Sequence, residues 1–298
     1  MFKQFFNIFV LKVICVLNKM KHIKIKLPQK TNLRNFFYKL NLKFIVDESK
    51  KLASLYSRGG KFIYSEDGSL YSGDARINPN PHPPHLKDLS FLYQFITLNK
   101  RTTVLEYGCG WTSLIIHLAL MSNKKKYKKA FARCGDPFNS YIVDCSKRYL
   151  NICRKRIKKY SVNHKFVKYC FSNVRMTKFN DRFATEYIKH PLVNPDFIFL
   201  DGPSQFVGFK KRIDNFTVRH FSMMPMLCNI LKFEHFLTPG TIILTDGRSA
   251  DSRFLLSNFQ RNWFHIHNEK QDVNILYLDE KPLGRWNREQ LNYYKNIR

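Results

Sequence analysis

From residue 102 onward, short apolar runs alternate with longer segments in which apolar residues recur with helical spacing. The short runs are rich in β-branched and aromatic residues and are bounded by polar ones, which is the pattern of β-strands. The run DFIFLD is apolar at successive positions, as expected of a parallel strand covered on both faces. The predicted strands are TTVLEY (102–107), YIVDC (141–145), KFVKYCF (165–171), DFIFLD (196–201) and TIILTD (241–246).

The longer segments predict helices over residues 86–99, 112–121, 146–160, 219–237 and 251–261. Near the C-terminus, FHIHNE (264–269) and VNILYL (273–278) are separated by a short polar turn and predict a closing β-hairpin. Strands that alternate with helices form a doubly wound sheet. We therefore predict an α/β fold with a mainly parallel seven-stranded sheet and a C-terminal β-hairpin.

The N-terminal part has a different character. Residues 1–57 are basic and favour helix, and residues 58–85 are rich in Gly, Asp, Asn and Pro and predict a loop. The chain thus divides into an appendage with its loop (1–85) and a domain (86–298). His82 and His85 lie in the loop as weak candidates for metal ligands, because prolines separate them and no cysteine is near.

The apolar run at residues 5–17, FFNIFVLKVICVL, is too short to span a bilayer and is interrupted by Asn7 and Lys12. Lysines follow it up to residue 26. Three interpretations stay open for residues 5–26. They form a helix packed on the domain or on a second copy of the chain, a helix on an anionic membrane surface, or a signal or anchor segment.

The net charge limits which binding partners are plausible, and the cysteine content limits which cellular compartment is plausible. The chain has 51 Lys and Arg against 22 Asp and Glu, a formal net charge of +29. Either RNA or an anionic membrane is a partner, or the chain is simply rich in lysine throughout. The seven cysteines are odd in number and none is spaced as CxxC, which excludes a disulfide framework and a zinc module. We therefore expect a reducing, cytoplasmic compartment, with peripheral membrane contact left open.

Acidic residues end four of the five predicted strands: Glu106, Asp144, Asp201 and Asp246. Ligands of doubly wound sheets bind outside the carboxyl ends of the strands. An acid at a strand end can instead cap the next helix or turn, but four such residues in order favour a binding site. Just after the first strand, Gly108 and Gly110 allow a sharp turn and close approach of a ligand to the backbone.

At Val104-Leu105-Glu106-Tyr107-Gly108-Cys109-Gly110 the sequence resembles the first motif of the class I S-adenosylmethionine-dependent methyltransferases, and the resemblance extends over about residues 98–280. It implies that Glu106 faces the amino-acid end of the cofactor and that Asp144 binds the ribose hydroxyls. Many members have a third glycine where this chain has Thr112. The residues that the resemblance assigns to the cofactor are Glu106, Gly108, Cys109, Gly110, Asp144 and, for the adenine edge, Ser172 and Asn173.

The ribose residue has one competitor. Asp144 lies 38 residues beyond Glu106, whereas a dinucleotide fingerprint places its acid about 20 residues on. A basic insertion over residues 122–140 accounts for the difference. Asp136 is closer in sequence, but Asp136-Pro137 is typical of a turn, so we prefer Asp144.

The acids of the fourth and fifth strands resemble the Mg²⁺ ligands of metal-dependent O-methyltransferases, of which the catechol and macrocin enzymes are examples. Two carboxylates, Asp201 and Asp246, would suit that ion. The catechol-type pattern has Asn and Lys where this chain has Gly247 and Ser204, so its base is absent. Without a metal, a hydroxyl acceptor needs a base, and Asp201 and His220 are the candidates.

Arg248 stands beside Asp246 and would either bind an anionic substrate group or neutralise the acid. Asp201-Gly202-Pro203-Ser204 differs from the tetrapeptide of amino-nitrogen methylation, and no Pro-Cys dipeptide occurs for cytosine C5 chemistry. The leading hypothesis is therefore O-methylation of a small molecule, a sugar or a lipid-linked glycan. An RNA methyltransferase and a non-catalytic adaptor of the same fold remain alternatives, and a nicotinamide dehydrogenase is disfavoured.

Overall fold

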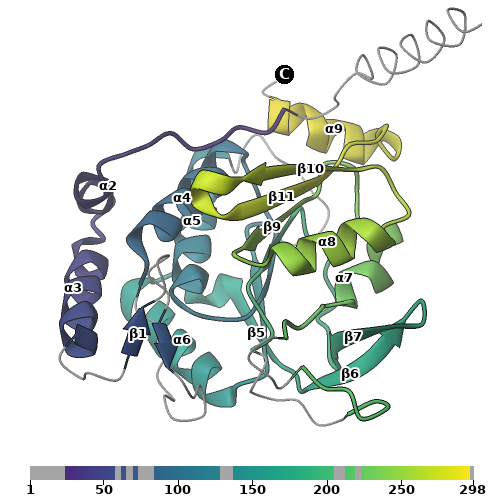
Figure 1. Cartoon of the computed structure of the whole chain (residues 1–298). Helices are drawn as coiled ribbons and strands as arrows, with labels where there is room; N and C mark the ends of the chain where they lie inside the picture. The colour runs from purple at the N-terminus through teal and green to yellow at the C-terminus, as the bar shows by residue number, and fades with distance from the viewer. Residues whose placement is uncertain are drawn as a thin grey trace, which may run out of the picture.

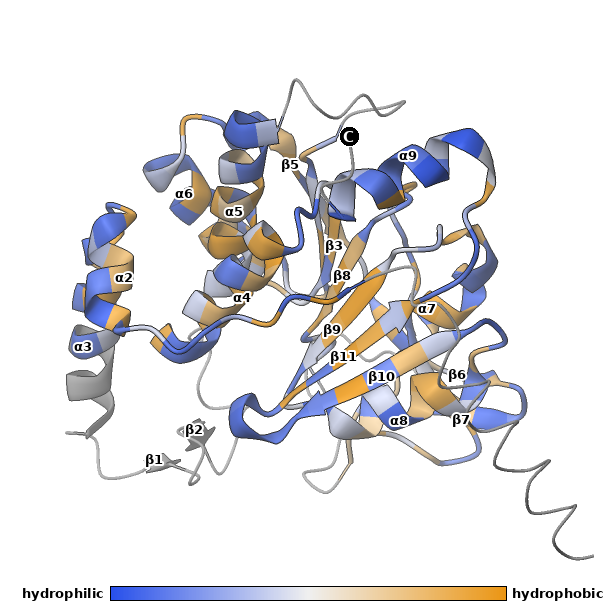
Figure 2. Cartoon of the chain, turned by 90° about the horizontal axis from the view of Figure 1, so that it is seen from above, coloured by the Kyte–Doolittle hydropathy of each residue, from blue (hydrophilic) through white to orange (hydrophobic). Residues whose placement is uncertain are grey.

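The computed structural model of the 298-residue chain describes residues 24–57, 62–64, 70–72, 84–127, 137–204, 212–218 and 223–295. A central sheet is covered by helices on both faces (Figure 1). Viewed from above, α4, α5 and α6 lie on one side of this sheet, and α7 and α8 lie on the other (Figure 2).

The central sheet has seven strands in the order β10-β11-β9-β8-β3-β4-β5. The five strands from β9 to β5 are parallel, whereas β11 runs antiparallel to β9 and pairs with β10 in a C-terminal hairpin. The fold class predicted from the sequence is confirmed. The bounds are β3 (Val104–Tyr107), β4 (Ser140–Asp144), β5 (Val167–Phe171), β8 (Phe197–Leu200), β9 (Ile242–Asp246), β10 (Trp263–Asn268) and β11 (Val273–Leu278).

The chain order reverses at β3, which has β4 on one side and β8 on the other. Such a switch point opens a crevice at the carboxyl ends of the strands. Four of the five parallel strands, all but β5, therefore bring their terminal acids to one edge of the sheet.

Apolar residues from both faces of the sheet form two cores. In β8, Phe199 packs with the core that includes α4 (Leu86–Leu98), α5 (Trp111–Tyr127) and α6 (Lys147–Tyr160). Its neighbour Ile198 packs with the opposite core, over α7 (Asn229–Lys232) and α8 (Ser249–Asn258). This alternation along a fully buried strand explains why its sequence is continuously apolar.

The helix predicted over residues 219–237 is wrong. Residues 219–222 lie outside the described part of the chain, and the helical portion beyond them is limited to α7 and the 3₁₀ turn Glu234–Phe236. Leu227 instead pairs with Thr185 in a parallel bridge, and the Cys228 amide donates to the Thr185 carbonyl at 2.9 Å. The apolar residues there are therefore explained by packing beside a strand.

Two further elements were not predicted. Residues 174–187 form the hairpin β6 (Val174–Phe179) and β7 (Arg182–Tyr187), and the C-terminal segment forms α9 (Gly284–Lys295). The turn of the hairpin is Asn180-Asp181, and both residues have positive φ. Helix α9 is held to the sheet by Tyr294, whose hydroxyl donates to the buried carboxylate of Asp196 at 2.7 Å.

The N-terminal appendage contains α2 (Leu33–Lys39) and α3 (Lys43–Ser57), and its buried residues join the core that includes α4. Within the segment predicted as loop, β1 (Phe62–Tyr64) and β2 (Leu70–Ser72) form a short antiparallel pair. The apolar run at residues 5–17 lies outside the described residues. In the described part of the chain, none of the helices combines the length and hydropathy needed to cross a membrane.

Candidate cofactor and acceptor site

The glycine turn after β3 is in backbone contact with the end of β8. Gly108 has φ +92°, and a Cβ built on it would lie 3.0 Å from the carbonyl atoms of Asp201. A Cβ on Gly202 would lie 2.7 Å from the amide nitrogen of Gly108. Both positions therefore require glycine, because the atoms in the way belong to the backbone. The predicted turn is present and forms a cradle open to the carboxyl edge of the sheet.

Asp144, at the end of β4, is fixed against this turn. Its Oδ2 accepts a hydrogen bond from the Cys109 amide at 2.9 Å, and its Oδ1 accepts one from the Ser146 amide at 2.6 Å. Burial raises the pKa of this carboxyl, although the amide donors oppose the effect. Each carboxylate oxygen can accept more than one hydrogen bond, so lone pairs remain for two ribose hydroxyls.

Glu106 is fully buried in β3, beneath the cradle. Its Oε1 accepts a 2.6 Å hydrogen bond from the Thr112 hydroxyl, whereas its buried Oε2 makes no hydrogen bond of standard geometry within the described residues, although the Ser113 hydroxyl is near enough to lower the pKa of the carboxyl. Burial raises the pKa of Glu106 well above its ordinary value. In its ionised form this buried carboxylate lacks a donor for Oε2, and the ammonium group of an amino-acid ligand would supply one and favour loss of the proton. The residues here thus fit the amino-acid end of S-adenosylmethionine.

Asp201 follows β8, and solvent reaches its side chain although protein surrounds it closely. Desolvation raises the pKa of Asp201 to about 6, and the positive charge of Arg248 works against the rise. Arg248 donates through Nε to the buried carboxylate of Asp251 at 2.7 Å. The arginine is therefore held by a structural ion pair while its charge favours ionisation of Asp201.

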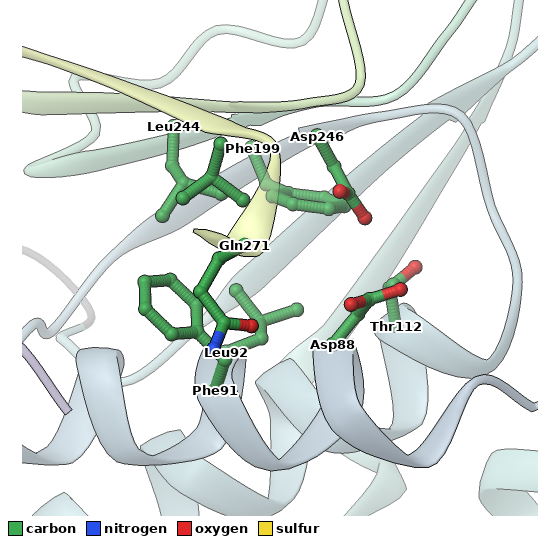
Figure 3. Close-up of a pocket in the computed structure, with 9 residues that line it drawn as sticks. Asp88, Phe91, Leu92, Thr112, Phe199, Leu244, Asp246 and Gln271 are labelled. Carbon is green, nitrogen blue, oxygen red and sulfur yellow. The ribbon is translucent and has the colours of Figure 1, made fainter. Parts of the chain in front are cut away.

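Asp246 ends β9 and lines a narrow pocket between the sheet and helix α4, with room for about one water molecule. In Figure 3 the Asp246 carboxylate points toward Asp88 and Thr112 from the opposite wall. The remaining lining is mainly apolar and comes from Phe91, Leu92, Phe199, Leu244, Gln271 and Val273.

Among the described residues, no three His, Cys, Asp or Glu side chains lie close enough together to hold a metal ion. The two-carboxylate Mg²⁺ site of Asp201 and Asp246 therefore stays a prediction. His85 contacts Asp88, its neighbour across the first turn of α4, and His82 lies outside the described residues.

The residues predicted for the adenine edge have structural partners. Ser172 is fully buried, donates through Oγ to the Asn173 carbonyl at 3.0 Å and accepts from the Lys189 amide at 2.7 Å. It thereby ties the end of β5 to the end of β7, and its adenine role remains untested. The candidate base His220 and the competing acid Asp136 both lie outside the described residues.

The structure adds two aromatic residues that the sequence analysis missed. Tyr187 stacks on Tyr107 with ring centroids 5.6 Å apart, and the Tyr107 hydroxyl is 2.7 Å from Nε2 of His190. The Tyr187 hydroxyl is buried, has no hydrogen-bond partner in the described structure and lies over Gly202. No local signal marks Tyr187, because β7 reaches the site only through tertiary packing, whereas Tyr107 lies within the glycine motif without being given a role there.

Comparison with protein-family models gives no match, and comparison with curated proteins gives none either. Similar solved structures include an O-methyltransferase from Bacillus cereus in complex with SAH, at 13% identity over 78% of this chain and 91% of that one, with a TM-score of 0.37. The SAH-bound methyltransferase PaMTH1 of Podospora anserina has 12% identity, coverage of 87% and 100%, and a TM-score of 0.39. A methyltransferase from Geobacter sulfurreducens has 11% identity, coverage of 83% and 98%, and a TM-score of 0.39.

TM-scores this low do not support a fold assignment, so the fold class is assigned from the strand order alone. The sheet is parallel from β9 to β5, and β11 runs antiparallel to β9 and pairs with β10 in the C-terminal hairpin. The chain therefore has a doubly wound α/β fold with a C-terminal hairpin, as the sequence predicts.

Proposed function

We propose that this protein is an S-adenosylmethionine-dependent methyltransferase that acts on an oxygen acceptor. The observation that carries the proposal is the unpartnered, buried Oε2 of Glu106 beneath the Gly108 cradle. It needs a donor at the place where the amino-acid end of the cofactor would lie. The fixed carboxylate of Asp144 on the next strand supports the ribose position.

The bound cofactor supplies an electrophilic methyl group on a sulfonium. The residues of this chain hold and orient the partners: Glu106 accepts from the ammonium group, and Asp144 accepts from the ribose hydroxyls. Positioning of this kind lowers the barrier of an in-line displacement, because the reacting atoms no longer have to find one another.

Asp201 is the base in this proposal. With a pKa raised to about 6, its carboxylate is mostly ionised at neutral pH and is a stronger base than an ordinary aspartate. It would take the proton from an acceptor hydroxyl at the end of β8. The apolar wall formed by Phe91 and Phe199 would contact the apolar part of the acceptor, which we take to be a small molecule, a sugar or a lipid-linked glycan.

Transfer of a labelled methyl group from S-adenosylmethionine into fractionated cell extract tests the proposal. We expect labelled product with the wild type and none with Asp201→Asn, which leaves the carboxyl-edge shape unchanged. Chelation followed by added Mg²⁺ then tests whether Asp201 and Asp246 hold a metal. Cofactor binding without transfer to any fraction would contradict an enzyme and favour the adaptor.

A further inference from the structure

The outward face of helix α6 carries a row of basic side chains. The exposed members are Lys147, Arg148, Arg154, Lys155, Lys158 and Lys159, which are called here the α6 basic face. The spacing of these residues places them on one side of the helix, opposite the buried Leu150, Cys153 and Ile157. No Asp or Glu occurs in the helix. With 14 residues, α6 presents this charge along about 21 Å.

Stabilisation of helix α6 does not account for all the residues of the α6 basic face. Cations near a helix C-terminus are favourable, which accounts for Lys158 and Lys159. Lys147, however, lies in the first turn, where the helix dipole disfavours positive charge by roughly 0.3–1 kcal/mol. A cost of this kind at an exposed position indicates a partner that the charge serves.

Aromatic rings of the neighbouring edge strand support the row from below. Lys147 lies 5.0 Å from the ring centroid of Phe171, and Arg154 lies 4.8 Å from that of Tyr169. Both rings belong to β5, which ends the sheet on this side. These contacts restrict the side-chain motion of Lys147 and Arg154 in the unbound protein. A ligand that binds there therefore causes a smaller loss of side-chain entropy.

The chemistry of the face distinguishes between two kinds of anionic partner. An interfacial membrane helix inserts Trp, Phe or Leu side chains, whereas Leu150, Cys153 and Ile157 of α6 are buried in the core and only Ile152 is half-buried outside it. The exposed apolar side chain of Val162, past the helix end, stands alone in residues 147–168. A phosphodiester chain needs only cations in a row, with aromatic groups nearby.

We propose that the α6 basic face binds the phosphodiester backbone of single-stranded nucleic acid. The row begins at Lys147, directly after the Ser146 cap and three residues beyond Asp144, which accepts from the Cys109 amide. A strand bound along it therefore runs to the rim of the cofactor cradle. Binding is independent of the methyl-transfer proposal, because it needs neither cofactor nor acceptor.

Binding to the full chain is measured by fluorescence anisotropy of a labelled oligouridylate. An oligonucleotide of about 20 residues is used because compact single-strand sites cover roughly 4–16 nucleotides. The test variant is Lys155→Gln/Lys158→Gln/Lys159→Gln. The matched control is Lys281→Gln/Arg285→Gln/Arg288→Gln, which removes the same charge at and before α9, apart from α6 in both views (Figures 1 and 2). Thermal unfolding checks that both variants fold.

We expect the affinity of the wild type to fall as the salt concentration rises. The α6 variant should bind about tenfold more weakly in low salt. Its slope of log affinity against log salt should be smaller by about 2, because it loses three phosphate contacts and each contributes about 0.7. The control should stay within about twofold. Similar binding to oligothymidylate would show recognition of the backbone alone, and tighter binding to oligouridylate would assign RNA. Equal weakening by the control, or α6-dependent binding to vesicles with 30% phosphatidylserine but not to oligonucleotide, would overturn the proposal.

Discussion

The Thr112 hydroxyl donates a 2.6 Å hydrogen bond to Oε1 of Glu106, from the first turn of α5 back to the last residues of β3. Thr112 occupies the position at which many motifs of the kind that residues 104–110 resemble have a third glycine. The structure assigns its hydroxyl a specific hydrogen bond. The contact fixes one oxygen of a fully buried carboxyl and leaves the other, Oε2, for a ligand. The difference from the motif is thus part of the site.

Thr112→Val keeps the side-chain shape but removes the donor, and Glu106 Oε1 is then buried without its partner. We expect the free energy of unfolding to fall by about 1–3 kcal/mol, the usual cost of an unsatisfied buried group. Thr112→Ser, which keeps a hydroxyl, should lose much less. Urea unfolding of the three proteins measures the effect. A valine variant as stable as the wild type would show that the hydrogen bond does not form.

The contact between the two backbone segments predicts that Gly202→Ala damages the fold. Its Cβ would meet the Gly108 amide nitrogen at 2.7 Å, and neither backbone can move without breaking β3–β8 pairing. We expect a loss of more than about 2 kcal/mol in the free energy of unfolding.

Gly110→Ala is the matched control, because a Cβ there would meet only the Thr112 hydroxyl at 3.8 Å. Its stability should change by less than about 1 kcal/mol, while binding of S-adenosylhomocysteine weakens, since the cofactor approaches this turn. Equal destabilisation by the two alanines would contradict the described turn.

The pKa of about 6 for Asp201 predicts the pH dependence of methyl transfer. The base form increases as pH rises through 6, so the rate at limiting substrate should rise about tenfold between pH 5 and pH 7 and then level off. The pH profile of initial rates measures this limb. Asp201→Asn should abolish transfer at every pH, whereas a flat wild-type profile over the same range would exclude Asp201 as the base.

Glu106 predicts a pH dependence of stability with the opposite sign to that of an ordinary surface acid. Its pKa is raised in the folded chain by burial, so the folded state keeps the proton longer than the unfolded state does. The stabilising contribution is therefore complete below the unfolded pKa of about 4.5 and is lost as pH rises toward the folded pKa. Glu106→Gln should remove this decline in urea unfolding between pH 4.5 and pH 8. An unchanged slope would show that Glu106 does not titrate in this way.

The sequence predicts the sheet well because its strands are buried on both faces. Runs such as DFIFLD have no plausible place except a parallel core strand, and the acids that end them mark the carboxyl edge. The terminal hairpin is similarly local, since one short turn joins its two runs.

The failures arise where tertiary packing overrides local periodicity. Leu227 lies in a helix-like apolar pattern, yet it pairs beside Thr185 because β7 offers it backbone partners. The hairpin around Asn180-Asp181 had a usable signal, a two-residue turn of residues that tolerate positive φ. Tyr187 had none, because its place over Gly202 depends on how that hairpin packs against the sheet.

Calorimetric titration of S-adenosylhomocysteine into the wild type, Asp144→Ala and Asp144→Asn, with and without Mg²⁺, tests the central claim most directly. The asparagine variant keeps an oxygen for the Cys109 amide and so controls for the shape of the turn. The account predicts that the wild type binds and that both variants bind at least about tenfold more weakly, since a charge-assisted hydrogen bond is worth roughly 1.5–3 kcal/mol. No binding by the wild type, or equal binding by all three proteins, would contradict it.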